Sequence, residues 1–267
     1  MKRTIIVLSR KGGVAKSTLS ILLTNAADSA GHTPRLIDAD TPPPADGEKA
    51  GGGASLSGVF AGRVEQFVIT PDMQKLMSNV NEVTQHWYPL FDAIVAGNAL
   101  IDFGANVSDT FSTAWDAVGV MDEVRDAGTR LDVVVPITTH PDALAGGLAA
   151  VQAALRQMEG ATITLALIEK DGKFDHLQNH EIFTQFVALK DKGVRMLSVP
   201  RCISTLWSPL EVARVDFRRV LSIPRDQLPA LAERLGMSLR DVKLGMGQLA
   251  DWYAQVQDQI HALDLVL

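Results

Sequence analysis

The feature that most constrains the fold is a glycine-containing segment between an apolar stretch and a helical pattern. Residues 4–8 read Thr-Ile-Ile-Val-Leu, and residues 11–18 read Lys-Gly-Gly-Val-Ala-Lys-Ser-Thr. A helix is predicted to begin at about Lys16, with apolar residues at 19 and 21–23 on its buried side. In a strand–loop–helix unit of this kind, successive backbone N–H groups and a helix N-terminus point at one anion. The segment therefore predicts a phosphate-binding loop, and the alternative is a glycine-rich turn that binds nothing.

The residues of this loop have distinct expected roles. Lys16 is placed to reach the outer phosphates of a triphosphate, the Ser17 hydroxyl to bind Mg²⁺, and Thr18 to contact the innermost phosphate. Turn chemistry alone does not explain Lys-Ser-Thr at a helix start. The residues expected to contact nucleotide here are Gly12, Gly13, Val14, Ala15, Lys16, Ser17 and Thr18.

A second lysine, Lys11, precedes Lys16 by five residues. It is too far from the phosphates of its own loop to act as Lys16 does. One use for it is to reach across a two-fold interface into the triphosphate of a facing subunit, as positive charge at the developing transition state. The alternative is a solvated lysine beside Arg10.

Taken together, these residues resemble the deviant-Walker ATPases of the ParA/MinD type, whose loop reads KGGVGK[ST]. Lys11 matches the signature lysine of that family. Residues 36–40, Leu-Ile-Asp-Ala-Asp, resemble its LIDxD segment, and residues 100–105, Leu-Ile-Asp-Phe-Gly-Ala, resemble its Walker B strand. The motifs span residues 1–105 in the expected order, and the remainder matches only in its alternation of strands and helices. The chain looks most like the plasmid stabilisation and conjugal transfer branch (StbB- or TraL-like).

The resemblance implies an ATPase that uses ATP and Mg²⁺. ATP closes a homodimer, Lys11 completes the partner's site, and slow hydrolysis opens it again, in the service of plasmid or DNA partitioning, positioning or conjugal transfer. It further implies a partner protein that stimulates hydrolysis. The implied catalytic residues are Lys11, Lys16 and Asp40, of which Asp40 positions the attacking water. The implied metal residues are Ser17, Asp38 and Asp102.

The positions of three aspartates also indicate a metal site, independently of the family resemblance. Asp38 and Asp40 lie two apart on a predicted strand, so their side chains share one face, and Asp102 ends another apolar strand. The carboxyl ends of parallel strands border the phosphate crevice. The alternative is that each carboxylate caps a following turn or helix.

Two departures from the family pattern lead to a second hypothesis. Ala15 stands where the family has glycine, and its methyl group costs about 1–2 kcal/mol if the residue has a positive φ. That cost corresponds to roughly tenfold in affinity. Asp40 is followed by Thr-Pro-Pro-Pro where the family usually reads Pro-Gln. The alternative function is therefore a nucleotide-sensing or catalytically impaired adaptor that binds a partner protein or DNA without turnover. A metabolic ligase or kinase of the same loop class ranks last, because no small-substrate constellation is visible.

Composition and periodicity set the fold class. The 267 residues are 46% hydrophobic with one cysteine and a net charge of −6, which fits a cytoplasmic globular protein without a disulfide framework. No stretch approaches the ~20 apolar residues of a membrane span. Alternating strands and helices predict a doubly wound, mostly parallel α/β sheet. The strands are expected at 4–9, 34–39, 98–103, 130–137, 161–168 and 193–199, and the helices at 16–30, 72–96, 108–126, 142–158 and 177–190.

The chain is expected to form a single domain, 1–267, with 208–267 as a mostly helical extension packed on it. Residues 41–58 are rich in proline and glycine and are interpreted as a switch-like loop or a passive insertion. Residues 231–242 have the spacing of a helix-turn-helix, or of two packing helices with Ser238 as N-cap.

Two further groups of residues are candidates for ligand contact. Pro200 and Arg201 follow the last predicted strand and are placed to lie over the nucleotide base, whose identity the sequence leaves open. Arg214, Arg218 and Arg219 fall at i, i+4 and i+5 of a predicted helix. The family resemblance implies sequence-independent DNA binding by such arginines, and the alternative is a solvated or ion-paired helix face.

Overall fold

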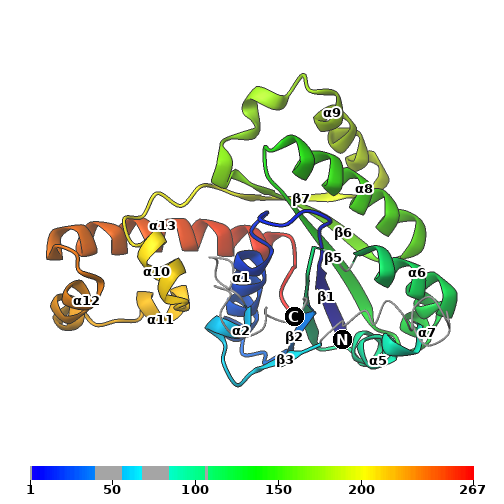
Figure 1. The fold of residues 1–267 in the computed structure, drawn as a ribbon, viewed down its shortest axis with the longest axis horizontal. Helices are drawn as coiled ribbons and strands as arrows, with labels where there is room; N and C mark the ends of the chain where they lie inside the picture. Colours follow the sequence, from blue (N-terminus) through cyan, green and yellow to red (C-terminus); the bar gives the residue numbers. More distant parts are fainter. Residues whose placement is uncertain (1, 40–55, 68–83, 106–107) are drawn as a thin grey trace, which may run out of the picture.

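The computed structural model describes residues 2–39, 56–67, 84–105 and 108–267 (Figure 1). Within these ranges a seven-stranded sheet has the order β3-β2-β4-β1-β5-β6-β7, and all its paired strands are parallel. The predicted doubly wound α/β class is therefore confirmed. The strands are β1 (Arg3–Val7), β2 (Arg35–Ala39), β3 (Val64–Gln66), β4 (Ala99–Phe103), β5 (Arg130–Ile137), β6 (Thr162–Ile168) and β7 (Arg195–Val199).

Helices cover both faces of the sheet (Figure 1). Successive strand residues point to opposite faces, so the neighbours Ile5 and Ile6 of β1 belong to two different hydrophobic clusters. One cluster lies under α5 (Tyr88–Ala96), α6 (Ser108–Val118), α7 (Val120–Asp126), α8 (Pro141–Gln157) and α9 (Glu181–Ala188). The other lies under α1 (Lys16–Ser29), α2 (Leu56–Val59), α10 (Trp207–Ala213), α11 (Phe217–Leu221), α12 (Leu228–Leu235) and α13 (Leu239–Ala262).

Several predicted elements differ in detail from the structure. The helix predicted at 108–126 is two helices, because Gly119 adopts a left-handed conformation at φ 72° between them. Of the helix predicted at 72–96, residues 88–96 form α5 and residues 84–86 are also helical, while residues 72–83 lie outside the described residues. The helix predicted at 177–190 is confined to α9. The short strand β3 was not predicted, and residues 56–58 of the predicted loop 41–58 are helical.

Of the C-terminal helices, α13 packs on α1, the helix that follows the candidate phosphate loop, while α11 and α12 pack on α13 (Figure 1). Buried Asn25 of α1 donates to Asp216, whose carboxylate also accepts from the Arg218 N–H and so caps α11. Gln257 of α13 donates to the carbonyl of Leu22 in α1. These bonds connect α1 directly to α11 and α13.

Residues 231–242, which could be a helix-turn-helix or two packing helices, form parts of α12 and α13 joined by a short turn. Gly236 ends α12 in a left-handed conformation, and the Ser238 side chain accepts from the Asp241 N–H to cap α13. The interpretation of two packing helices with Ser238 as N-cap accounts for these contacts. Across the described ranges, no helix has the length and apolar character needed to cross a bilayer.

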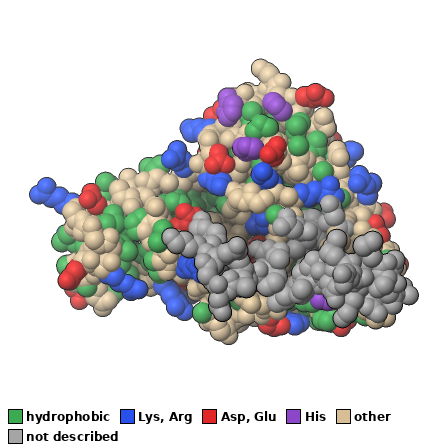
Figure 2. Space-filling view, in the orientation of Figure 1, with side chains coloured by type: hydrophobic (Ala, Val, Ile, Leu, Met, Phe, Trp, Pro, Cys, Tyr) green, Lys and Arg blue, Asp and Glu red, His purple; other side chains and the backbone are tan. Residues whose placement is uncertain are grey.

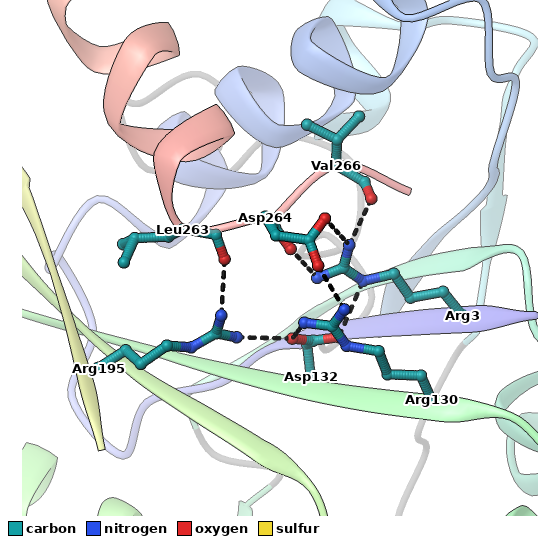
Figure 3. Close-up of polar contacts among 7 residues, drawn as sticks. All are labelled: Arg3, Arg130, Asp132, Arg195, Leu263, Asp264 and Val266. Atoms are coloured by element: carbon teal, nitrogen blue, oxygen red, sulfur yellow. Dashed lines mark hydrogen bonds and ion pairs between the residues drawn. The ribbon is translucent and has the colours of Figure 1, made fainter. Parts of the chain in front are cut away.

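At the amino ends of the strands, a buried charge network holds the segment after α13 (Figure 3). Asp132 is fully buried and pairs with Arg3 at 2.8 Å, Arg195 at 3.1 Å and Arg130 at 3.2 Å. Arg130 also pairs with Asp264, and further guanidinium hydrogen bonds reach the carbonyls of residues 263, 264 and 266. The phosphate loop follows the carboxyl end of β1. This network therefore lies at the opposite ends of the strands from the candidate site.

Candidate functional site

The loop between β1 and α1 contains two residues in the left-handed region and leads directly into the N-terminus of α1. Gly13 and Ala15 both have positive φ, at 75° and 61°, and the Ala15 carbonyl accepts the first intrahelical hydrogen bond of α1 from the Leu19 N–H. The N-cap residue of α1 is Ala15, whose side chain makes no capping hydrogen bond, and none of the residues in the first turn of α1 is acidic. The first N–H groups of a helix with such an N-terminus form a common anion-binding site.

Ala15 is the residue at which the loop departs from the family pattern, and it is strained as the sequence suggested. Its φ of 61° and ψ of 34° lie in the left-handed region, which costs an L-residue about 1–2 kcal/mol. The methyl group is half-buried and packs against the hydrophobic cluster under α1 and α13. It therefore lies on the protein side of the loop.

The two lysines of the loop are differently placed. The Lys16 ammonium donates to the Lys11 carbonyl at 3.3 Å, which holds it over the loop. The Lys11 ammonium lies 3.3 Å from the Asp142 carboxylate at the start of α8, and the two side chains are 44% and 65% exposed. A solvated ion pair of this kind is worth less than about 1 kcal/mol, so Lys11 is easily released from it.

The structure brings Asp38 and Asp102 together beside the loop. They are direct neighbours in the β2–β4 register, and Asp102 is also the register partner of Val7, the last residue of β1. Asp102 is only 4% exposed. The pKa of Asp102 is raised to about 7, first by burial and then by the charge of Asp38, against the opposing effects of the Ser17 hydrogen bond and the Lys16 charge.

These groups fit a magnesium ion bound together with a nucleotide. Among the described residues, Oδ1 of Asp102 has no hydrogen-bond partner although it is buried, and the Ser17 hydroxyl interacts with the same side chain. Carboxylate and hydroxyl oxygens are the ligands that Mg²⁺ prefers, usually completed by phosphate oxygens and water. The described residues contain no group of three or more His, Cys, Asp or Glu side chains that could hold a metal. The cation would therefore depend on phosphate oxygens for the rest of its shell.

The other residues predicted for the site do not all lie beside the phosphate loop among the described residues. Pro200 and Arg201 follow the carboxyl end of β7, which is three strands away from β1 in the sheet. The Pro200 carbonyl accepts a hydrogen bond from the Trp252 side chain at 2.7 Å. Arg201 is exposed. Asp40, the expected water-positioning residue, lies outside the described residues, as does the proline run after it.

The three arginines proposed for DNA do not share one helix, so that part of the prediction is wrong. Arg214 ends α10 in a left-handed conformation at φ 51°, whereas Arg218 and Arg219 lie on α11. All three are exposed, and Figure 2 shows basic side chains on the surface beside α11. Arg218 lies 3.8 Å from Asp28 of α1, and Arg63 makes two closer bonds to the same carboxylate.

One residue at the site was missed by the sequence analysis. Ser57 of α2 donates its hydroxyl to Oδ2 of Asp38 at 3.0 Å. It lies 19 residues further along the chain, in a stretch of small and polar residues that carries no recognisable signal. Only the folded chain brings it to the carboxylates.

Comparison with known proteins adds similarity of fold. No protein-family model matches the chain, and no curated protein sequence matches it. Two similar structures are the MinC:MinD cell division protein complex and the MinD cell division protein of Aquifex aeolicus, each 12% identical over 92% of this chain. They have TM-scores of 0.45 and 0.46, with 96% and 97% of their own chains covered. A third, pnob8 ParA, is 12% identical with a TM-score of 0.43 and 98% of both chains covered. Similarity at this level carries no argument about function, which therefore rests on the site.

Proposed function

We propose that the chain is an ATP-dependent switch of the ParA/MinD type. It binds ATP with Mg²⁺, forms a homodimer, hydrolyses ATP slowly, and serves plasmid or DNA partitioning, positioning or conjugal transfer in the cytoplasm, as in the StbB- or TraL-like branch. The observation that carries the proposal is that the α1 N-terminus, whose first turn holds no acidic residue, meets a buried carboxylate oxygen, Oδ1 of Asp102, that has no hydrogen-bond partner among the described residues. An anion and a cation side by side satisfy both.

The residues divide the work by position. The N–H groups of residues 12–18 and the Lys16 ammonium bind the phosphates, while Ser17, Asp38 and Asp102 hold the cation. Bound Mg²⁺ supplies positive charge that neutralises the phosphate oxygens. Asp40 orients the attacking water, and Lys11 leaves Asp142 to enter the partner's site. Pro200 and Arg201 cover the base.

Calorimetric titration of the purified chain with ATP, with and without Mg²⁺, tests the site. Wild type should bind with an affinity that Mg²⁺ increases, and Lys16→Ala should lose at least tenfold because it removes the charge nearest the outer phosphates. Lys190→Ala, an exposed lysine of the 3-10 turn 189–192, is the matched control and should bind as wild type. The absence of heat with millimolar ATP or GTP would contradict the proposal.

A second candidate is an adaptor that senses nucleotide or binds partners without turnover. Two observations favour it: Ala15 in the loop and the proline run after Asp40. Turnover with ATP and Mg²⁺ separates the two candidates, because the switch hydrolyses ATP and the adaptor does not. If Ala15→Gly creates binding and hydrolysis that the native chain lacks, the adaptor is the correct function.

The trans role of Lys11 and the binding of DNA are tested separately. Lys11→Ala should abolish ATP-dependent dimerisation or hydrolysis while the monomer still binds ATP, and unchanged turnover would refute a trans role. For DNA, a gel shift at two salt concentrations should show weaker binding by the variant with Arg218 and Arg219 changed to alanine, and a smaller loss with salt.

A further inference from the structure

The short helix α2 places a hydroxyl group beside the candidate metal carboxylates. Its apolar residues Leu56 and Val59 are 0% and 7% exposed and face the hydrophobic cluster that also buries α1. These two residues lie on one side of the helix turn, so Ser57 between them points to another side. There its hydroxyl reaches Oδ2 of Asp38 at 3.0 Å.

The position of α2 is fixed from its other end as well. The Phe60 N–H donates to the Leu56 carbonyl, which extends the turn to Phe60. Arg63 lies over the Phe60 ring at 5.4 Å from its centre and makes two hydrogen bonds, of 2.8 and 2.9 Å, to Asp28 of α1. Two buried side chains and a bidentate ion pair thus hold the helix against α1, which itself begins at the phosphate loop.

Asp38 has a particular need for a fixed donor. Its neighbour in the sheet register is Asp102, a carboxylate that is almost completely buried. Two adjacent carboxylates repel each other, and a hydrogen bond to one oxygen of Asp38 favours its charged form beside Asp102. A hydroxyl donor on one oxygen leaves the other oxygen of Asp38 in a defined direction.

We propose that Ser57 is a positioning residue that orients the Asp38 carboxylate for the magnesium ion of a bound nucleotide. The inference rests on the proposed function, because it concerns the cation of that site. Ser57 contacts neither the cation nor the phosphates in this role and acts through Asp38 alone. Outer-shell partners of metal ligands typically contribute about 10- to 100-fold in metal affinity.

The test compares ATP affinity in EDTA with ATP affinity at a series of Mg²⁺ concentrations, measured by calorimetry on the full chain. Ser57→Ala should bind ATP in EDTA as wild type does, while the gain in affinity from Mg²⁺ falls about tenfold. The exposed Ser208→Ala in α10 is the matched control and should keep the full gain. A Mg²⁺ gain in Ser57→Ala equal to that of wild type overturns the inference.

A pair of isosteric variants covers the case in which Ser57→Ala disturbs α2. Ser57→Thr keeps the hydroxyl group and should keep the Mg²⁺ gain, whereas Ser57→Val has the same shape without the hydroxyl and should lose it. Equal gains in the two variants overturn the inference whatever their stability. If wild type binds no ATP either in EDTA or with Mg²⁺, the proposed function itself fails, which is a different result from a Mg²⁺ gain that does not depend on Ser57.

Discussion

Replacement of Ala15 by glycine measures the strain in the phosphate loop. The left-handed backbone at φ 61° costs alanine about 1–2 kcal/mol, which glycine does not pay. Glycine adds entropy to the unfolded chain worth about 0.4–1 kcal/mol and removes a half-buried methyl group worth at most about 0.8 kcal/mol. These terms nearly cancel, so Ala15→Gly should change the free energy of unfolding by less than about 1 kcal/mol.

The matched control is the same substitution at an ordinary helical position. Ala145 is exposed in the interior of α8, so Ala145→Gly should cost about 1 kcal/mol, or about 2–4 °C in the thermal midpoint of a chain of this size. Urea and thermal unfolding of both variants without nucleotide would measure the contrast. If Ala15→Gly destabilises the protein as much as Ala145→Gly, Ala15 carries no left-handed strain and the reasoning fails.

Two buried carboxylates give further predictions. The pKa of Asp102 is about 7 when folded and about 4 when unfolded, so its contribution to stability is complete below about pH 4 and is lost as the pH rises through 7. Asp102→Asn should therefore be more stable than wild type at pH 8, by up to about 4 kcal/mol, and equal unfolding curves there would contradict the shift. Asp132→Asn should cost about 3–5 kcal/mol, because it leaves three guanidinium groups without their shared buried partner. Asp264→Asn, at a largely exposed carboxylate, should cost far less, and similar urea midpoints for the two variants would refute that difference.

The parts of the fold that sequence could predict are those with a local signal. Largely apolar runs such as 99–103 and 130–137 become buried strands because both faces of a parallel sheet are covered. The phosphate loop was visible because its residue types and its strand–loop–helix setting occur together within 18 residues. Strand β3 had no such signal, since it has three residues and a single half-buried apolar side chain, Val64.

The unpredicted features come from contacts between distant residues or from unusual backbone. Asp132 pairs with Arg3 and Arg195, which lie 129 and 63 residues away in the sequence. No local sequence pattern therefore predicts this charge network. Arg214 was placed on a helix with Arg218, but it adopts a left-handed conformation that arginine rarely takes, and the helix ends there. Ser57 likewise joins Asp38 only because α2 folds back onto α1.

The structure also changes what Ala15 implies for nucleotide affinity. A strain that is present both with and without ligand cancels from the binding free energy, because only a difference between the two states affects affinity. The loop already has the left-handed conformation at Ala15, and the methyl group packs toward the hydrophobic cluster. Ala15→Gly should therefore leave ATP affinity within about threefold of wild type, less than the tenfold that the sequence alone suggested. A tenfold gain in calorimetric affinity would show instead that the methyl group obstructs the phosphates, and would favour the adaptor over the switch.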